Sequence, residues 1–180
     1  MHTIAKFIYF KVLGWKLHGE FPLHIKKCVV PVVPHTSWHD FYIGILARSV
    51  WKAEINFVGK KSLFQAPFGW YFRWMGGTPI DRSNSTDFVS ATAKIFDEKE
   101  TFRLNLAPEG TRKKVQKLKT GFYYIAKMAK VPIVMVAFDF ENKQVKVAEP
   151  FYTSESIEDD FKKIDSFLKG IKGKVPENSY

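Results

Sequence analysis

The chain of 180 residues has a single cysteine, Cys28, so it cannot form an internal disulfide bond. That scarcity fits a reducing compartment. Because Cys28 lies in the apolar run 28–33, we expect it to be a buried core residue. The chain also lacks repeats, low-complexity stretches and an interdomain linker. Its length suits one domain with a full hydrophobic core.

Long apolar runs are also missing, since no segment reaches the ~18 residues of a transmembrane helix. The nearest candidate is the N-terminus, where Lys6, Lys11 and Lys16 interrupt the apolar residues. It has no small-residue cleavage site, which argues against a signal peptide. We predict a short apolar helix over residues 1–18. It lies either in a membrane interface, with lysines reaching the headgroups, or against the core of the domain.

Acidic residues are few: 18 Asp and Glu stand against 28 Lys and Arg, giving a net charge of +10. Six of the acids lie in residues 155–180, so the positive charge belongs to the main body. Such a field attracts phosphates, nucleic acid, anionic lipid or acidic proteins. The alternative is a basic surface that serves only solubility.

The remaining pattern alternates strands with helices. Residues 19–180 are therefore predicted to form one α/β domain with a central, largely parallel or mixed sheet flanked by helices. Pro31 favours an edge position or a bulge for its strand. The predicted strands are 28–33, 55–59, 78–80, 101–108 and 131–140, the last with 143–151 as hairpin partner. The predicted helices are 37–51, 62–76 (broken around Pro67), 84–100, 121–130 and 154–172.

Two polar residues, His35 and Glu109, come directly after apolar strands. In open α/β sheets, ligands bind beyond the carboxyl ends of the strands, so these residues mark a candidate site. His35 opens the stretch HTSWHD (35–40), which admits three interpretations. As a metal site, His35 and His39 have helical spacing, but no glutamate follows the first histidine and no further ligand pattern appears.

The second interpretation is a helix cap, because Ser37 and Asp40 have the spacing of a capping box. The third is a catalytic pair of His35 and Asp40. On one regular helix these residues would point about 140° apart, so His35 must precede the helix. A carboxylate bonded to one ring nitrogen fixes the tautomer and leaves the other nitrogen as a base. Without a G-x-S-x-G elbow, the base would act on a substrate hydroxyl rather than on Ser37.

The H-x4-D spacing of His35 and Asp40 is followed by GGTPIDR (76–82), APEGTR (107–112) and VPIV (131–134). Together these four blocks, in this order, resemble the glycerolipid acyltransferases of the 1-acylglycerol-3-phosphate acyltransferase-like family. The resemblance implies that His35 is the general base, that Asp40 orients it, and that Arg82 binds a phosphate. It also implies an acceptor site built by Glu109, Gly110, Thr111 and Arg112, and an acyl-donor side that includes Val131 and Pro132.

The residue chemistry agrees with these implied roles. Arg82 and Arg112 carry forked donors that suit a phosphate, although Asp81 and Glu109 offer them surface salt bridges instead. The basic segment 111–119 includes Lys113 and Lys114. It is either a solvated charge run or a docking site for the phosphates of CoA or for an acidic carrier protein. We assign Lys113 and Lys114 to the acyl-donor side.

The resemblance implies an O-acyltransferase that moves a fatty acyl group from acyl-CoA or acyl-acyl carrier protein to a lysophospholipid such as 1-acylglycerol-3-phosphate. Pro79 stands where the family usually has an aromatic residue, which admits another acceptor such as a lyso-aminolipid. We expect no metal and no cofactor. We expect a cytoplasmic protein, peripheral on the inner face of the cell membrane. The rival is an inactive basic module that binds anionic membrane or nucleic acid; no nucleic-acid recognition motif supports the latter.

Overall fold

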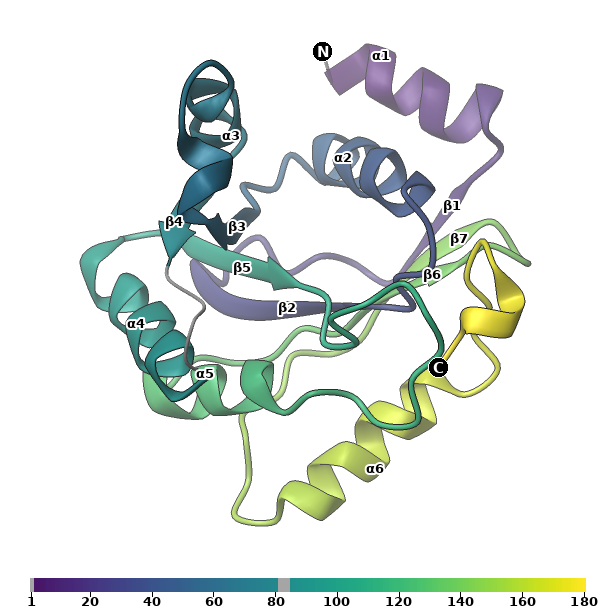
Figure 1. Ribbon diagram of the computed structural model, residues 1–180. Coiled ribbons are helices and arrows are strands. Elements are labelled where there is room, and N and C mark those ends of the chain that lie inside the picture. The colour runs from purple at the N-terminus through teal and green to yellow at the C-terminus, as the bar shows by residue number, and fades with distance from the viewer. Residues whose placement is uncertain (1, 81–84) are drawn as a thin grey trace.

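A seven-stranded sheet forms the centre of the computed structural model, which describes residues 2–80 and 85–180 and, at 85–87, the backbone only (Figure 1). The strand order is β1-β7-β6-β2-β5-β3-β4, and every neighbouring pair is parallel except the antiparallel β6–β7. The predicted mixed α/β sheet is confirmed. The strands are β1 (Lys16–His18), β2 (Lys27–Val33), β3 (Asn56–Lys60), β4 (Gly77–Ile80), β5 (Phe102–Leu106), β6 (Val136–Asp139) and β7 (Gln144–Val147).

Helices cover both faces of this sheet. In Figure 1, α1 and α2 lie above it, α4, α5 and α6 lie below it, and α3 projects from the upper left. Most boundaries fall within a few residues of the predicted ones. The helices are α1 (His2–Lys6), which continues as the π-helical turn η1 (Phe7–Val12), α2 (His39–Trp51), the 3₁₀ turn η2 (Lys61–Phe64), α3 (Gly69–Trp74), α4 (Ser85–Glu98), α5 (Gly121–Ala129), α6 (Ile157–Leu168) and the 3₁₀ turn η3 (Pro176–Asn178).

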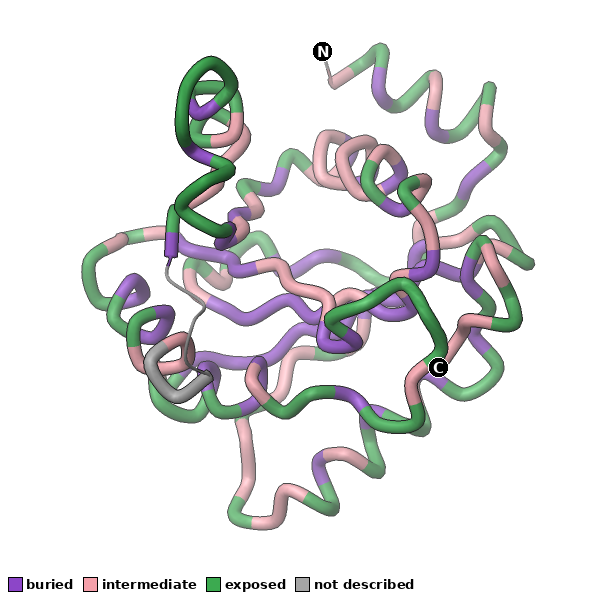
Figure 2. Tube along the Cα trace, viewed as in Figure 1, coloured by how far each residue is buried: buried purple, intermediate pink, exposed green. Residues whose placement is uncertain are grey.

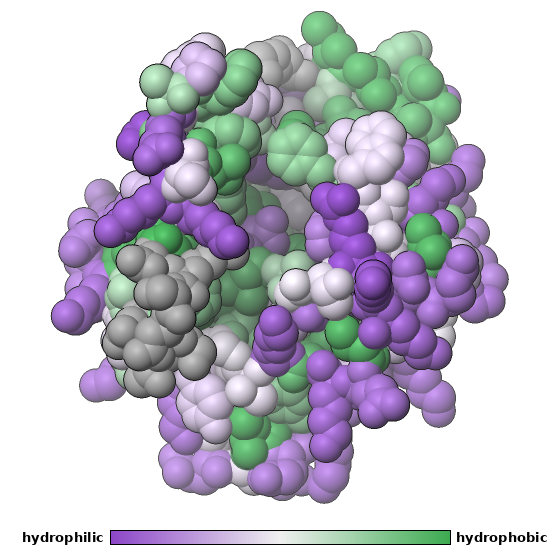
Figure 3. Space-filling model, in the orientation of Figure 1, coloured by the Kyte–Doolittle hydropathy of each residue, from purple (hydrophilic) through white to green (hydrophobic). Residues whose placement is uncertain are grey.

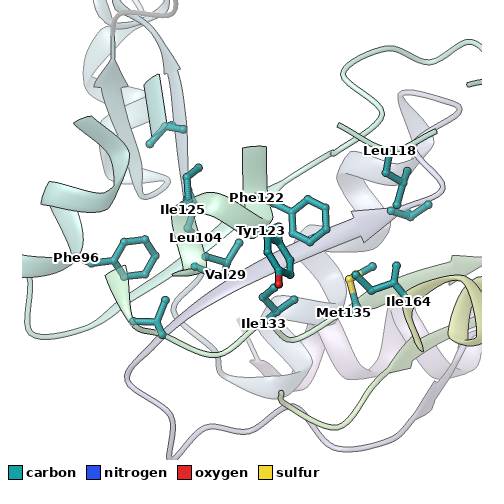
Figure 4. Packing of buried hydrophobic residues seen from close by; sticks show 14 of the residues in the cluster. Val29, Phe96, Leu104, Leu118, Phe122, Tyr123, Ile125, Ile133, Met135 and Ile164 are labelled. Atoms are coloured by element: carbon teal, nitrogen blue, oxygen red, sulfur yellow. The ribbon is translucent and has the colours of Figure 1, made fainter. Parts of the chain in front are cut away.

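The two-residue period of the strands divides the core into two layers. In β2, Val29 and Val33 join the cluster under α4, α5 and α6, whereas Cys28 and Val30 join the cluster under α1 and α2. Figure 2 shows the strands running buried between the exposed helix faces, and Figure 4 shows Val29 and other strand residues packed against α4 and α5. A sheet buried on both faces explains the continuous apolar run 28–33 of β2.

The expected edge position of Pro31 is wrong, because β2 lies in the middle of the sheet between β5 and β6. Pro31 has no N–H to donate to the ladder. On the β6 side, Ile133 makes only an isolated bridge with Val29, and regular pairing resumes at Val32 with Val136. Because Pro31 interrupts the pairing between β2 and β6, the regular strand β6 begins at Val136 and not at residue 131 as predicted.

The N-terminal helix ends at Val12, and Lys16–His18 form an edge strand paired with β7. The predicted helix over residues 1–18 is therefore too long. One side of the helix packs on the core through Ala5 and Tyr9, while its other side exposes the apolar side chains of Ile4, Phe7, Phe10 and Val12. The burial of Ala5 and Tyr9 supports the interpretation that the helix packs on the core, and the membrane interpretation stays a prediction. Within residues 2–80 and 85–180, no helix is long and apolar enough to cross a bilayer.

Candidate active site

His35 and Asp40 meet in the connection between β2 and α2. β2 ends at Val33 and α2 begins at His39, so His35 precedes the helix and Asp40 lies in its first turn. The chain curls back far enough to bring Nδ1 of His35 within 3.0 Å of Oδ2 of Asp40. Asp40 is buried and His35 is partly exposed. This arrangement holds Nδ1 against the carboxylate, and a histidine held in this way can use its other ring nitrogen, Nε2, as a base.

Asp40 also closes the first turn of α2. Its Oδ2 accepts a hydrogen bond from the backbone N–H of Ser37 at 2.9 Å, which is one half of a capping box. The other half is not formed: the Ser37 hydroxyl is bonded to Nδ1 of His39 at 2.8 Å. Capping and histidine orientation are therefore two uses of one carboxylate oxygen. The other oxygen, Oδ1, is buried without a hydrogen-bond partner among the described residues.

Glu109 reaches the same site from the end of β5. Its side chain is 2% exposed, and its Oε2 accepts a hydrogen bond from the backbone N–H of His35 at 2.7 Å. Burial raises the pKa of Glu109 to about 7, against the opposing effect of that hydrogen bond and of His35 nearby. Among the described residues, it forms no ion pair with Arg112 or any other cation. Glu109 thus fixes the backbone that carries His35.

A cleft of about 1550 Å³ opens beside His35, and Figure 3 shows the surface hollowed there. One part of its lining is polar and basic, formed by His35, Asp40, Gly110, Thr111, Arg112 and Lys119. Another part is apolar and lies between α2 and the sheet, formed by Val30, Val32, Ile45, Val136 and Phe138. A cleft with cations in one part and an apolar wall in another suits an amphiphile with an anionic headgroup.

The turn after β5 depends on Gly110, which has φ +65° and whose N–H donates to Ala107 O at 3.1 Å. A Cβ at this position would lie 2.6 Å from Nζ of Lys119, so the ammonium group packs directly on the glycine. Lys119 and Arg48 both line the cleft, and the sequence did not single out either of them. The place of Lys119 depends on the loop folding back, where the Lys119 N–H donates to Pro108 O at 2.9 Å.

Not every candidate residue reaches the cleft. Lys113 and Lys114 are exposed in the loop that borders it, without lining it. Val131 and Pro132 are buried near the start of β2, where the Val29 N–H donates to Pro132 O, roughly 13 Å along the strand from its carboxyl end at Val33. The Val131 N–H donates to Ala126 O at 3.1 Å. The structure therefore does not bring Val131 and Pro132 to the cleft. Arg82 lies outside the described residues.

The two histidines of the stretch do not converge. Nδ1 of His35 faces Asp40, whereas Nδ1 of His39 is bonded to Ser37, and the His39 ring lies against Trp38. Among the side chains of residues 2–80 and 88–180, no three from His, Cys, Asp or Glu gather as a metal site would require.

Residues 15–139, which include His35, Asp40 and Glu109, match the family model described as acyltransferase. Similar curated proteins include the 1-acyl-sn-glycerol-3-phosphate acyltransferases of Streptococcus pneumoniae (31% identity over 71% of this chain) and Bacillus subtilis (28% over 69%). The enzyme of the same name from Saccharomyces cerevisiae is 31% identical over 69% of this chain. The chain spans only 50%, 62% and 42% of these three relatives, respectively.

A similar solved structure is that of the 1-acyl-sn-glycerophosphate (LPA) acyltransferase PlsC from Thermotoga maritima. It superposes with a TM-score of 0.61 over 93% of this chain and 75% of that chain, at 22% identity. At that identity the likeness establishes the fold.

Proposed function

The chain belongs to the acyltransferase family, and on that premise we propose that it is an O-acyltransferase acting on a lysophospholipid, with 1-acylglycerol-3-phosphate as the first acceptor to test. The observation that carries the proposal is the 3.0 Å contact between His35 and Asp40 in the lining of an amphiphilic cleft. The names of the three relatives support the choice of acceptor.

In the proposed reaction, Asp40 accepts a hydrogen bond from Nδ1–H of His35, so Nε2 is unprotonated and basic. Nε2 removes the proton of the acceptor hydroxyl as its oxygen attacks the carbonyl carbon of the acyl thioester. The tetrahedral intermediate collapses, the carbon–sulfur bond breaks, and the thiolate takes the proton from the imidazolium. The products are an ester and a free thiol, and His35 returns to its starting form.

The acceptor phosphate is proposed to bind the cations of the cleft. Arg112 and Lys119 line it, and neither forms an ion pair with a carboxylate among the described residues. Arg112 supplies a forked donor set and Lys119 a point charge. We keep Arg82 as a third phosphate ligand, and this assignment rests only on the sequence motif GGTPIDR. Gly110 and Thr111 shape the wall beside them.

The donor is proposed to be acyl-CoA or acyl-acyl carrier protein, both of which are anionic thioesters. The exposed Lys113 and Lys114, at the border of the cleft, would attract either one. Because the acceptor is a membrane lipid, we place the reaction in membrane lipid synthesis. We place the protein on the cytoplasmic face of the cell membrane, with the exposed apolar side of the N-terminal helix against the lipid.

Replacement of His35 by alanine tests the proposal. General base catalysis contributes roughly 10²–10⁴-fold, so the variant should lose about that factor in kcat while remaining folded by circular dichroism. The assay measures free thiol released from palmitoyl-CoA in the presence of lysophosphatidic acid or another lysolipid. His39→Ala is the matched control and should keep most of the activity. A folded His35→Ala protein that acylates at the wild-type rate would remove His35 as the base.

A further inference from the structure

The segment 61–74, comprising η2, the intervening turn and α3, projects from the sheet as a small lobe, which we call the aromatic lobe (Figure 1). Three aromatic side chains of the lobe are largely exposed to solvent: Phe68 is 66% exposed, Trp70 is 70% and Trp74 is 69%. Leu63 and Tyr71 are also exposed. Large apolar residues gathered on one lobe require a partner that takes them out of water.

The lobe is folded and not a loose loop. Within the lobe, Phe64 is buried, and Nη1 of Arg73 donates to Phe64 O at 3.0 Å while the guanidinium lies over the Phe64 ring. Gly69 lies so close that a Cβ there would be 2.0 Å from Phe64 O. Its N–H donates to Gln65 O at 2.8 Å. These internal contacts keep the lobe ordered with its tryptophans exposed, so binding costs little further conformational entropy of the lobe backbone.

The charged side chains of the segment 55–80, which contains the lobe, are all basic. Lys60, Lys61 and Arg73 are exposed on or beside the lobe, and the sequence has no acidic residue from 55 to 80. Tryptophan and tyrosine prefer the boundary between headgroups and hydrocarbon, and lysine and arginine prefer anionic headgroups. This combination fits an anionic bilayer surface.

The lobe also lies where such a surface would serve the cleft. Met75, directly after α3, lines the cleft. In Figure 1, α3 and α1 stand at the same upper end of the molecule, on either side of α2. The exposed apolar residues of α1 and η1 appear as the green area at the upper right of Figure 3.

We propose that the aromatic lobe inserts into the interface of an anionic membrane and holds the cleft mouth toward the bilayer. The use of this contact, delivery of a lipid acceptor, rests on the proposed function; the contact itself does not. The lobe is a second point of attachment, separate from the N-terminal helix. Two separated attachment points fix the orientation of the cleft, whereas one would leave the protein free to pivot.

Vesicle flotation of the full chain tests the insertion, with phosphatidylglycerol–phosphatidylcholine vesicles and phosphatidylcholine vesicles as probes. The wild-type protein should float with the anionic vesicles and less with the neutral ones. Each large side chain that inserts is worth roughly tenfold in the partition ratio, so the triple variant Phe68→Ala, Trp70→Ala, Trp74→Ala should lower the bound-to-free ratio by up to roughly 10³-fold. Tyr152→Ala, an equally exposed aromatic between β7 and α6, is the control and should bind as the wild type does.

A second measurement uses a variant that leaves the lobe folded. Trp70→Phe with Trp74→Phe retains apolar bulk, so this variant should still float. It should lose most of the quenching of tryptophan fluorescence by brominated lipid that the wild type shows. Flotation of the alanine variant at the wild-type level, or unchanged quenching in the phenylalanine variant, would overturn the proposal.

A second copy of the chain is the other occupant to test. If the wild type sediments as a dimer without lipid and the alanine variant as a monomer, the lobe is a protein interface and the proposal fails. None of these measurements uses catalysis. Loss of acyltransferase activity would therefore count against the proposed function and leave the membrane contact to be judged by flotation.

Discussion

At the scale of single residues, Glu109 is the least expected group of the site. A carboxyl group that is 2% exposed and forms no ion pair with a described residue is costly to ionise, and burial accordingly raises its pKa to about 7 from an ordinary value of 4.5. Its bond to the His35 backbone keeps it in place. Near neutral pH the site therefore contains a carboxyl group that is partly protonated, next to the proposed base.

This pKa predicts how stability depends on pH. The folded state binds a proton at Glu109 more tightly than the unfolded state, so the contribution of this group is fully present below pH 4.5 and is lost as pH rises toward 7. The expected loss is on the order of 3 kcal/mol. Glu109→Gln, whose amide oxygen can still accept from the His35 N–H, should not lose stability in this window. Urea unfolding of both proteins at pH 5, 6, 7 and 8 measures the difference; parallel curves would contradict the raised pKa.

Among the elements, the N-terminal helix combines two environments in a few residues. Tyr9 is completely buried, and its hydroxyl donates to Lys16 O at 3.2 Å, whereas Phe7 is 61% exposed. The inner side belongs to the hydrophobic cluster under α2, together with Trp15. The helix is therefore part of the domain core, and its outer side alone is available for a membrane.

Paired alanine substitutions separate these two sides. Tyr9→Ala removes a buried aromatic ring and should lower the free energy of unfolding by roughly 3–5 kcal/mol. Phe7→Ala removes an exposed ring and should change it by less than about 0.5 kcal/mol. Urea denaturation followed by circular dichroism measures both. Equal, small effects would mean that the helix is not part of the cooperative core.

At the scale of the whole molecule, the net charge of +10 is distributed unevenly. Several acids are used internally, such as Asp139 with Lys146 and Asp160 with Lys163. The basic loop bordering the cleft has no such compensation among the described residues, since Lys113 and Lys114 form no ion pair there. The field of the protein is therefore expected to draw anionic substrates toward the site.

Removing two of these charges tests the steering. Lys113→Ser with Lys114→Ser should raise the KM for acyl-CoA roughly three- to tenfold at low salt, and the difference should shrink at high salt because charges become screened. Lys162→Ser with Lys169→Ser changes the net charge equally on and after α6 and should leave the KM close to that of the wild type. Equal effects of both pairs would show that only the net charge matters.

The sequence alone determined the alternating α/β order, because two-residue and helical periods are local properties of the chain. It also predicted the pairing of His35 with Asp40 as one of three interpretations of that stretch, because a helix that begins after His35 can bring the two side chains together; the structure shows the contact. The same local reasoning failed for Pro31, which tertiary packing keeps in a central strand.

Only the tertiary structure decided which distant residues join the site. The bond between Glu109 and the backbone of His35 spans 74 positions, and it exists because β2 and β5 are neighbours in the sheet. The tertiary structure likewise brings Lys119 against Gly110 in the cleft. It keeps Val131 and Pro132 in the core, away from the cleft. These placements depend on strand order and burial, which arise when the whole chain packs and are not encoded in any short segment.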